Sequence, residues 1–230
     1  MAAGPNTGRS GLLKVAVLIS GSGSNLQALI DHFGPSVKAS PIDIVLVLSN
    51  RADAYGLQRA TTAGLSTKVV EHRNFKDRVD FDAAIDRDIR ASGAELVVLA
   101  GFMRLLTPGF IEAWHDRLVN IHPALLPSFR GLDTHRRALK RGVKVHGCTV
   151  HYVRVEMDTG PIIAQAVVPV AADDTPETLG ARVLAAEHKL YPAALRLIAE
   201  GRVTVEQDRA VVRSSQPEAG PLFSPPLGMD

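Results

Sequence analysis

The chain has 230 residues, 46% of them hydrophobic and 22% charged, which suits one globular domain with a sizeable core and excludes a disordered chain. With 26 Lys and Arg against 24 Asp and Glu, the charge gives no reason to expect nucleic acid or a membrane as a partner. The single cysteine, Cys148, excludes a disulfide framework and a multi-thiolate zinc site within one chain.

The first residues predict no targeting segment. Residues 1–10 lack a signal-peptide pattern, and the apolar run at 11–19 is short and interrupted by Lys14. We therefore expect a cytoplasmic protein.

Strand-like and helix-like segments alternate through the first half of the chain. The apolar run at 14–19 predicts a strand, and apolar residues at helical spacing from Leu26 to Phe33 predict the next helix. Ser24, with Gln27 three residues on, predicts a capping box for that helix. The further elements expected are strands at 42–48, 67–70, 95–100 and 118–121 and helices at 54–63, 79–91 and 108–115. Apolar strands separated by helices are typical of a parallel sheet covered on both faces.

The pattern changes in the second half. Strands are expected at 145–155 and 162–170, joined by a short acidic Gly-Pro connection. Because parallel strands need a crossover of about a dozen residues, this pair should be antiparallel or offset at the sheet edge. A helix at 176–200 and strands at 202–206 and 210–213 follow. We expect one doubly wound, mostly parallel α/β domain at 11–213, between flexible tails at 1–10 and 214–230, the second rich in proline.

A glycine-rich loop, Gly21–Asn25 (GSGSN), lies between the first strand and its helix. This position offers backbone N–H groups and the positive end of the helix dipole to an anion. The loop lacks the Gly-Lys-Ser/Thr of a Walker motif. It is also a poor dinucleotide fingerprint, since Leu26 replaces the third glycine. The loop predicts a monophosphate site, with a tight turn that binds nothing as the alternative.

Asn120 and His122 end the fifth expected strand, just before Pro123. Side chains alternate along a strand, so the two point to the same face at the carboxyl edge of the sheet, where such sheets bind ligands. An amide that stabilises an oxyanion and an imidazole that moves a proton suit acyl chemistry. Since no paired nucleophile is evident, a substrate would supply it. Asp158, in the acidic turn, is a candidate partner that would orient His122. A strand cap and a solvated turn are the alternatives.

Several segments together resemble the phosphoribosylglycinamide formyltransferase family, in its order and spacing, over about residues 15–213. The segments that carry the resemblance are SGSGSNLQALID (20–31), AGFMRLLTP (100–108), LVNIHPALLPSFRG (118–131), HGCTVHYV (146–153), MDTGPIIAQ (157–165) and AEHKLYP (186–192).

The resemblance implies a formyltransferase fold and an enzyme of purine biosynthesis. It would move a formyl group from 10-formyltetrahydrofolate to glycinamide ribonucleotide, with the ribonucleotide site in the N-terminal half and the folate site in the C-terminal half. The implied catalytic residues are Asn120, His122 and Asp158. The implied ribonucleotide-binding residues are Gly23, Ser24, Asn25 and Glu187. The implied folate-binding residues are Arg78, Met103, Arg104, Leu105, Leu106 and Asn120. Asp133 departs from the family pattern, so no role is carried over to it.

No metal is expected, because strand alternation puts His146 and Cys148 on one face and His151 on the other. The expected partners are small-molecule substrates, with a homodimer left open. Alternatives are a formyltetrahydrofolate hydrolase, another folate-dependent formyltransferase with the same Asn-His-Asp site, and a non-catalytic nucleotide-binding module. The basic stretch at 130–144 is interpreted mainly as a solvated helix face, with attraction of an anionic tail or phosphate as the alternative.

Overall fold

The structure is a computed structural model that describes residues 11–213 and Ser224. The tails expected at 1–10 and 214–230 therefore lie outside the described residues, apart from Ser224. Among the described helices, none is both long and apolar enough to cross a membrane.

Within the described residues, seven strands form the main sheet, in the order β3-β2-β1-β4-β5-β6-β7. They are β1 (Leu13–Ile19), β2 (Ile42–Ser49), β3 (Thr67–Val69), β4 (Leu96–Leu99), β5 (Leu118–His122), β6 (Val145–Tyr152) and β7 (Ile162–Pro169). The first five are parallel, whereas β6 pairs antiparallel with both of its neighbours. This confirms the doubly wound, mostly parallel sheet with an antiparallel strand near its edge.

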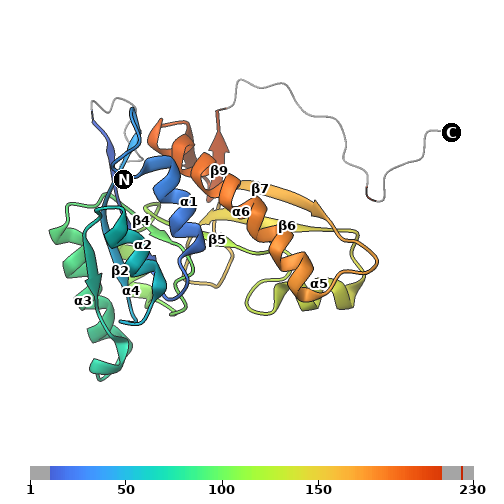
Figure 1. The fold of residues 1–230 in the computed structure, drawn as a ribbon, viewed down its shortest axis with the longest axis horizontal. Coiled ribbons are helices and arrows are strands. Elements are labelled where there is room, and N and C mark those ends of the chain that lie inside the picture. Colours follow the sequence, from blue (N-terminus) through green and yellow to red (C-terminus); the bar gives the residue numbers. More distant parts are fainter. Residues whose placement is uncertain (1–10, 214–223, 225–230) are drawn as a thin grey trace.

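Helices cover both faces of the sheet. They are α1 (Ser24–Phe33), α2 (Tyr55–Thr62), α3 (Arg78–Ala91), α4 (Pro108–Ala113), α5 (Thr134–Arg141) and α6 (Pro176–Ala199), with a short 3-10 helix, η1 (His72–Asn74). A separate hairpin of β8 (Val203–Glu206) and β9 (Arg209–Val212) follows α6. Figure 1 shows α1 and α6 side by side across one face, while β6, β7 and α5 extend to the right.

The central strands carry long apolar runs because each face of the sheet has its own core. Along β1, Val17 belongs to the cluster under α1 and α6, whereas its neighbours Ala16 and Leu18 belong to the cluster under α3 and α4. Successive strand residues point to opposite faces, so burial on both faces requires an unbroken apolar run. A third cluster joins α5 and α6 to β6 and β7.

The first helix begins differently from the capping-box prediction, which is wrong. Ser24 is already the first helical residue, and its predecessor Gly23 is the N-cap, without a side-chain cap. The side chain of Gln27 instead bonds Asp31 and Arg59. The early N–H groups of α1 therefore receive no capping side chain and remain available to an anion.

The strand order decides which segments meet at the carboxyl edge of the sheet. The glycine loop after β1 lies between the segments that follow β2 and β4, and β5 comes next. On the far side of β5, Asn120 is paired with His151 and His122 with Thr149 of β6. Residues distant in sequence are thus gathered around the end of β5.

Candidate functional site

His122, at the end of β5, is buried between two oxygen atoms. Its Nε2 lies 3.0 Å from the carbonyl oxygen of Phe129, and its Nδ1 lies 3.5 Å from Oδ2 of Asp158. The same carboxylate oxygen accepts a 2.8 Å hydrogen bond from the backbone N–H of Gly131. The structure therefore places the acidic turn against His122, and these contacts fix the orientation of the ring.

A third polar side chain, His151, reaches the same place, and the sequence analysis did not assign it. Its Nδ1 lies 2.9 Å from the carbonyl oxygen of Tyr152, and its Nε2 lies 3.3 Å from Nδ2 of Asn120. Burial lowers the pKa of His151, so the ring is neutral near pH 7. Because Nδ1–H donates to a carbonyl, Nε2 is left to accept from the amide of Asn120. This bond fixes the amide and leaves its second N–H for a ligand.

The glycine loop forms one wall of a cavity of about 630 Å³. Gly23 has φ +68°, and a Cβ there would lie 2.6 Å from Cα of Gly56, so no larger residue fits this turn without movement. The lining residues are Ser20, Gly21, Ser22, Gly23, Ser24, Asn25, Asn50, Arg51, His72, Arg73, Ala100, Gly101, Met103 and Arg104. Three arginines and the start of α1 thus surround a space suited to an anion.

Asn25 and Glu187 meet at the start of α1. The Nδ2 of Asn25 donates a 2.8 Å hydrogen bond to Oε2 of Glu187, and both residues are buried. Burial raises the pKa of Glu187, while the bond from Asn25 opposes that rise. The Oδ1 of Asn25 is buried with no partner among the described residues, so it can accept from a ligand hydroxyl. Since Glu187 comes from α6, the ribonucleotide positions are not confined to the N-terminal half.

A family model described as formyl transferase matches residues 13–195. The chain belongs to the formyl transferase family. It is 44% identical over 200 residues to the phosphoribosylglycinamide formyltransferase of Escherichia coli, covering 86% of this chain and 92% of that protein. A solved glycinamide ribonucleotide transformylase from Symbiobacterium toebii matches with 45% identity and a TM-score of 0.84, over 93% of this chain and 100% of that one.

Other relatives are much longer. A human trifunctional purine biosynthetic protein, adenosine-3, is 50% identical over 195 residues, which are 85% of this chain and 19% of that protein. The chicken protein of the same name is also 50% identical, over 193 residues that are 84% of this chain and 19% of that protein. This formyl transferase chain therefore spans about a fifth of the length of those relatives.

The predicted folate-side residues of this formyl transferase lie on one segment and a nearby helix, apart from Asn120, which lies in β5. The segment from Met103 to Leu106 connects β4 to α4, and the side chains of Met103 and Leu105 are exposed. Arg78 is the first residue of α3, and Asp82, one turn later, accepts a 2.6 Å bond from the N–H of Thr107. The implied folate positions therefore fall between Arg78 and Asn120, and not in a separate C-terminal half of the chain.

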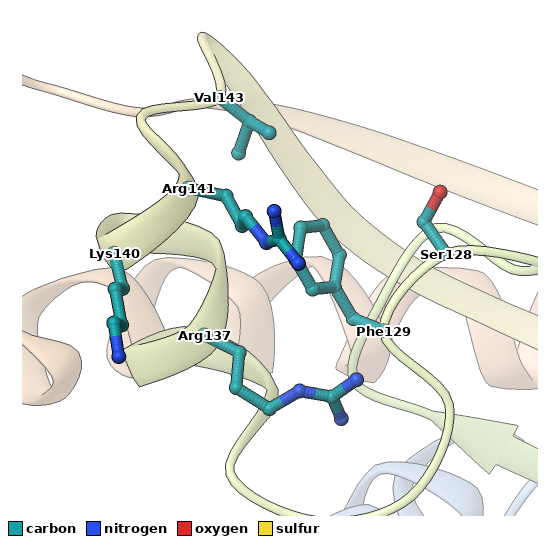
Figure 2. A pocket seen from close by; sticks show the side chains of 6 residues that line it. All are labelled: Ser128, Phe129, Arg137, Lys140, Arg141 and Val143. Atoms are coloured by element: carbon teal, nitrogen blue, oxygen red, sulfur yellow. The ribbon is translucent and has the colours of Figure 1, made fainter.

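The basic stretch of this formyl transferase forms a separate groove of about 760 Å³. Figure 2 shows Arg137, Lys140 and Arg141 extending from α5, with Phe129 and Ser128 on the facing loop. These basic side chains are exposed, in keeping with the solvated helix face. The catalytic candidates do not line this groove, although the carbonyl oxygen of Phe129, one of its lining residues, lies 3.0 Å from Nε2 of His122.

His135, His146 and Cys148 lie close together on β6 and α5, where the two histidine rings pack against each other and the cysteine is buried. The ring of His146 stands edge-on to those of Phe129 and His135, at 5.7 and 5.4 Å between centroids. Burial lowers the pKa of His146 to about 4 and raises that of Cys148 to about 12. Within the described residues, no group of three or more His, Cys, Asp or Glu side chains could hold a metal ion.

Proposed function

We propose that this formyl transferase moves the formyl group of 10-formyltetrahydrofolate to the amine of glycinamide ribonucleotide. The observation that carries the proposal is the meeting of Asn120, His122 and Asp158 at the end of β5. The anion cavity at the start of α1 supports a phosphorylated acceptor. The names of the relatives point to the same substrate.

The reaction follows from the chemistry of these side chains. The amine of the ribonucleotide attacks the formyl carbon, and a C–N bond forms as the carbonyl becomes an oxyanion. The free amide N–H of Asn120 stabilises that oxyanion. His122 moves a proton from the attacking amine to the departing N10 of the folate, and Asp158 holds the ring. Collapse of the tetrahedral intermediate gives formylglycinamide ribonucleotide and tetrahydrofolate.

The ribonucleotide would be held at two points. Its phosphate would bind the N–H groups at Ser24 and Asn25, and Glu187 would accept hydrogen bonds from ribose hydroxyls. Two anchors position the amine against the formyl carbon, which converts a bimolecular reaction into a nearly intramolecular one. The exposed Met103 and Leu105 would contact the folate, while Arg78 and Arg104 would attract its carboxylates. The same features argue against a hydrolase, because water needs no phosphate anchor.

A transfer assay tests the proposal. The purified chain is given 10-formyltetrahydrofolate with glycinamide ribonucleotide, or with water as the only acceptor. We expect tetrahydrofolate to form rapidly with the ribonucleotide and formylated product to appear in equal amount. Equal rates with and without the ribonucleotide would indicate a hydrolase. Binding without turnover would indicate a nucleotide-binding module.

A paired substitution tests the acceptor site. Glu187→Gln removes a buried charge and should weaken ribonucleotide binding by about 10- to 100-fold, with folate binding nearly unchanged. Glu177→Gln alters an exposed glutamate at the start of the same helix and should change neither. Lost folate binding with normal ribonucleotide affinity would show that the two sites are assigned wrongly. We also propose a cytoplasmic location. Whether the chain forms a homodimer is a separate question, which sedimentation of the pure chain would decide.

A further inference from the structure

Ser20, the residue between β1 and the glycine loop, is bonded to a segment more than eighty residues away. Its backbone N–H donates to the carbonyl oxygen of Gly101 at 3.1 Å. Its hydroxyl oxygen accepts a 2.8 Å bond from the backbone N–H of Met103. One buried serine therefore holds the segment after β4 at two points.

Asn50, at the end of β2, completes the arrangement. The hydroxyl of Ser20 donates to Oδ1 of Asn50 at 2.6 Å, and Asn50 is itself buried. Because Ser20 gives its only proton to Asn50, its lone pairs face the N–H of Met103. The Nδ2 of Asn50 lies 3.2 Å from Nδ1 of His72, which ties the chain of hydrogen bonds to η1. All four residues line the cavity beside the glycine loop.

The segment held by this chain has no regular secondary structure. Residues 101–107 lie between β4 and α4, and neither a helix nor a strand fixes their backbone. Two of their hydrogen bonds are made with Ser20, and in a third the N–H of Thr107 donates to the carboxylate of Asp82. The position of Met103 therefore depends on the side chain of the residue that directly precedes the glycine loop.

We propose that Ser20 and Asn50 are positioning residues that couple the two substrate sites. Ribonucleotide bound at the glycine loop would hold Ser20 and Asn50 in place, and they would fix the backbone at Met103 where the folate binds. Folate would then bind more tightly to the chain that already holds the ribonucleotide, and the reverse must also hold. The inference rests on the proposed function for the identity of the two substrates, and neither residue contacts the reacting atoms.

Ser20→Ala is the decisive variant. It leaves the N–H of Met103 and Oδ1 of Asn50 without their partner, and an unpaired buried group should weaken folate binding by about 5- to 100-fold. Ser20→Thr retains the hydroxyl and should recover most of the affinity. Asn50→Ala frees the hydroxyl to turn away from Met103 and should weaken folate binding less. Ser40→Ala is the control, because that hydroxyl also makes two hydrogen bonds, both to Ile42 at the start of β2.

The measurement is the dissociation constant of a 5,8-dideazafolate without a formyl group, alone and with saturating glycinamide ribonucleotide. In the unaltered chain the ribonucleotide should tighten folate binding at least about fivefold. In Ser20→Ala the ratio should fall toward one, while Ser40→Ala should keep it. The proposal would be overturned if folded Ser20→Ala kept the ratio of the dissociation constants measured without and with ribonucleotide. It would also be overturned if Ser20→Ala and Ser40→Ala lowered that ratio equally. If Ser20→Ala does not fold, Asn50→Ala should lower the ratio of the two dissociation constants and Ser20→Thr should keep it; an unchanged ratio in Asn50→Ala would then overturn the proposal.

Formyl transfer by the unaltered chain is measured first, so the two proposals fail separately. Absence of transfer would remove the proposed function. Normal transfer with no effect of the ribonucleotide on folate binding would remove only the coupling.

Discussion

Asp158→Asn separates charge from shape at the proposed proton-transfer site. Oδ2 of Asp158 now accepts from Gly131 at 2.8 Å and faces Nδ1 of His122 at 3.5 Å. In the variant, the N–H of Gly131 still needs an acceptor, so the amide oxygen takes that place and the amide nitrogen turns toward His122. Nδ1 would then accept from the amide while Nε2–H donates to Phe129, so the ring would be fixed in one tautomer with no lone pair free to take up a proton.

The expected loss follows from that tautomer. General acid–base catalysis contributes on the order of 10²–10⁴ in rate, and the ring stays in place, so we expect a fall in turnover of roughly 10². The pH dependence of turnover should change too, because the carboxylate no longer faces the ring. Folding should survive, since the amide has the size of the carboxylate.

The assay is initial formyl-transfer rate at saturating substrates, from mildly acidic to mildly alkaline pH. Glu156→Gln is the matched control, because Glu156 belongs to the same turn, its side chain is 77% exposed, and that side chain pairs with Arg130 at 3.3 Å rather than with His122. It should leave both rate and pH profile unchanged. A folded Asp158→Asn variant with the unaltered profile, where chemistry limits turnover, would refute the coupling of Asp158 to His122.

Three further predictions follow from the geometry. In folded variants, His122→Ala should lower initial rates by roughly 10²–10⁴ and Asn120→Ala by roughly 10²–10³; near-normal rates would contradict their roles. Gly23→Ala should lower the free energy of unfolding by about 1–3 kcal/mol, since φ is +68° and Gly56 is in the way; unchanged urea unfolding would contradict this. The pKa of His146 is lowered from 6.5 to about 4, so the unfolded chain binds more protons between those values. The neutral His146 contributes up to about 3 kcal/mol to the free energy of unfolding above pH 6.5, and this contribution is lost as the pH falls toward 4. The free energy of unfolding of His146→Phe should therefore fall less between these two pH values.

Features set by local sequence were predicted well. The apolar runs of β1, β2 and β4 identified buried strands, and the short connection between β6 and β7 identified an antiparallel pair. The start of α1 was predicted wrongly because Ser24 and Gln27 match a capping box in sequence. The turn at Gly23 must pass against Gly56, a contact across 33 residues, and this places Ser24 inside the helix.

Site residues that lie on a single strand could be predicted from the sequence. Site residues that are brought together by the pairing of different strands could not. Asn120 and His122 share a face of β5, so alternation alone placed them together. His151 joins them because β6 pairs with β5 in a register that only the folded sheet defines. The roles of Ser20 and Asn50 could not be predicted for the same reason, since their hydrogen bonds join the ends of three strands. Polar residues at strand ends are the sequence signal that these positions share.

The direction of α6 has a consequence for how this domain can be joined to others. The helix leaves β7 at the carboxyl edge of the sheet and returns to the opposite edge, where β1 starts and the β8–β9 hairpin lies. The hairpin is fastened there by Arg154, which pairs with both Asp116 and Asp208 at 2.7 Å. Both ends of the described domain thus emerge away from the glycine loop, at the top of Figure 1. The chain therefore enters β1 and leaves β9 on the side of the sheet opposite the glycine loop, so neither connection crosses the cavity beside that loop.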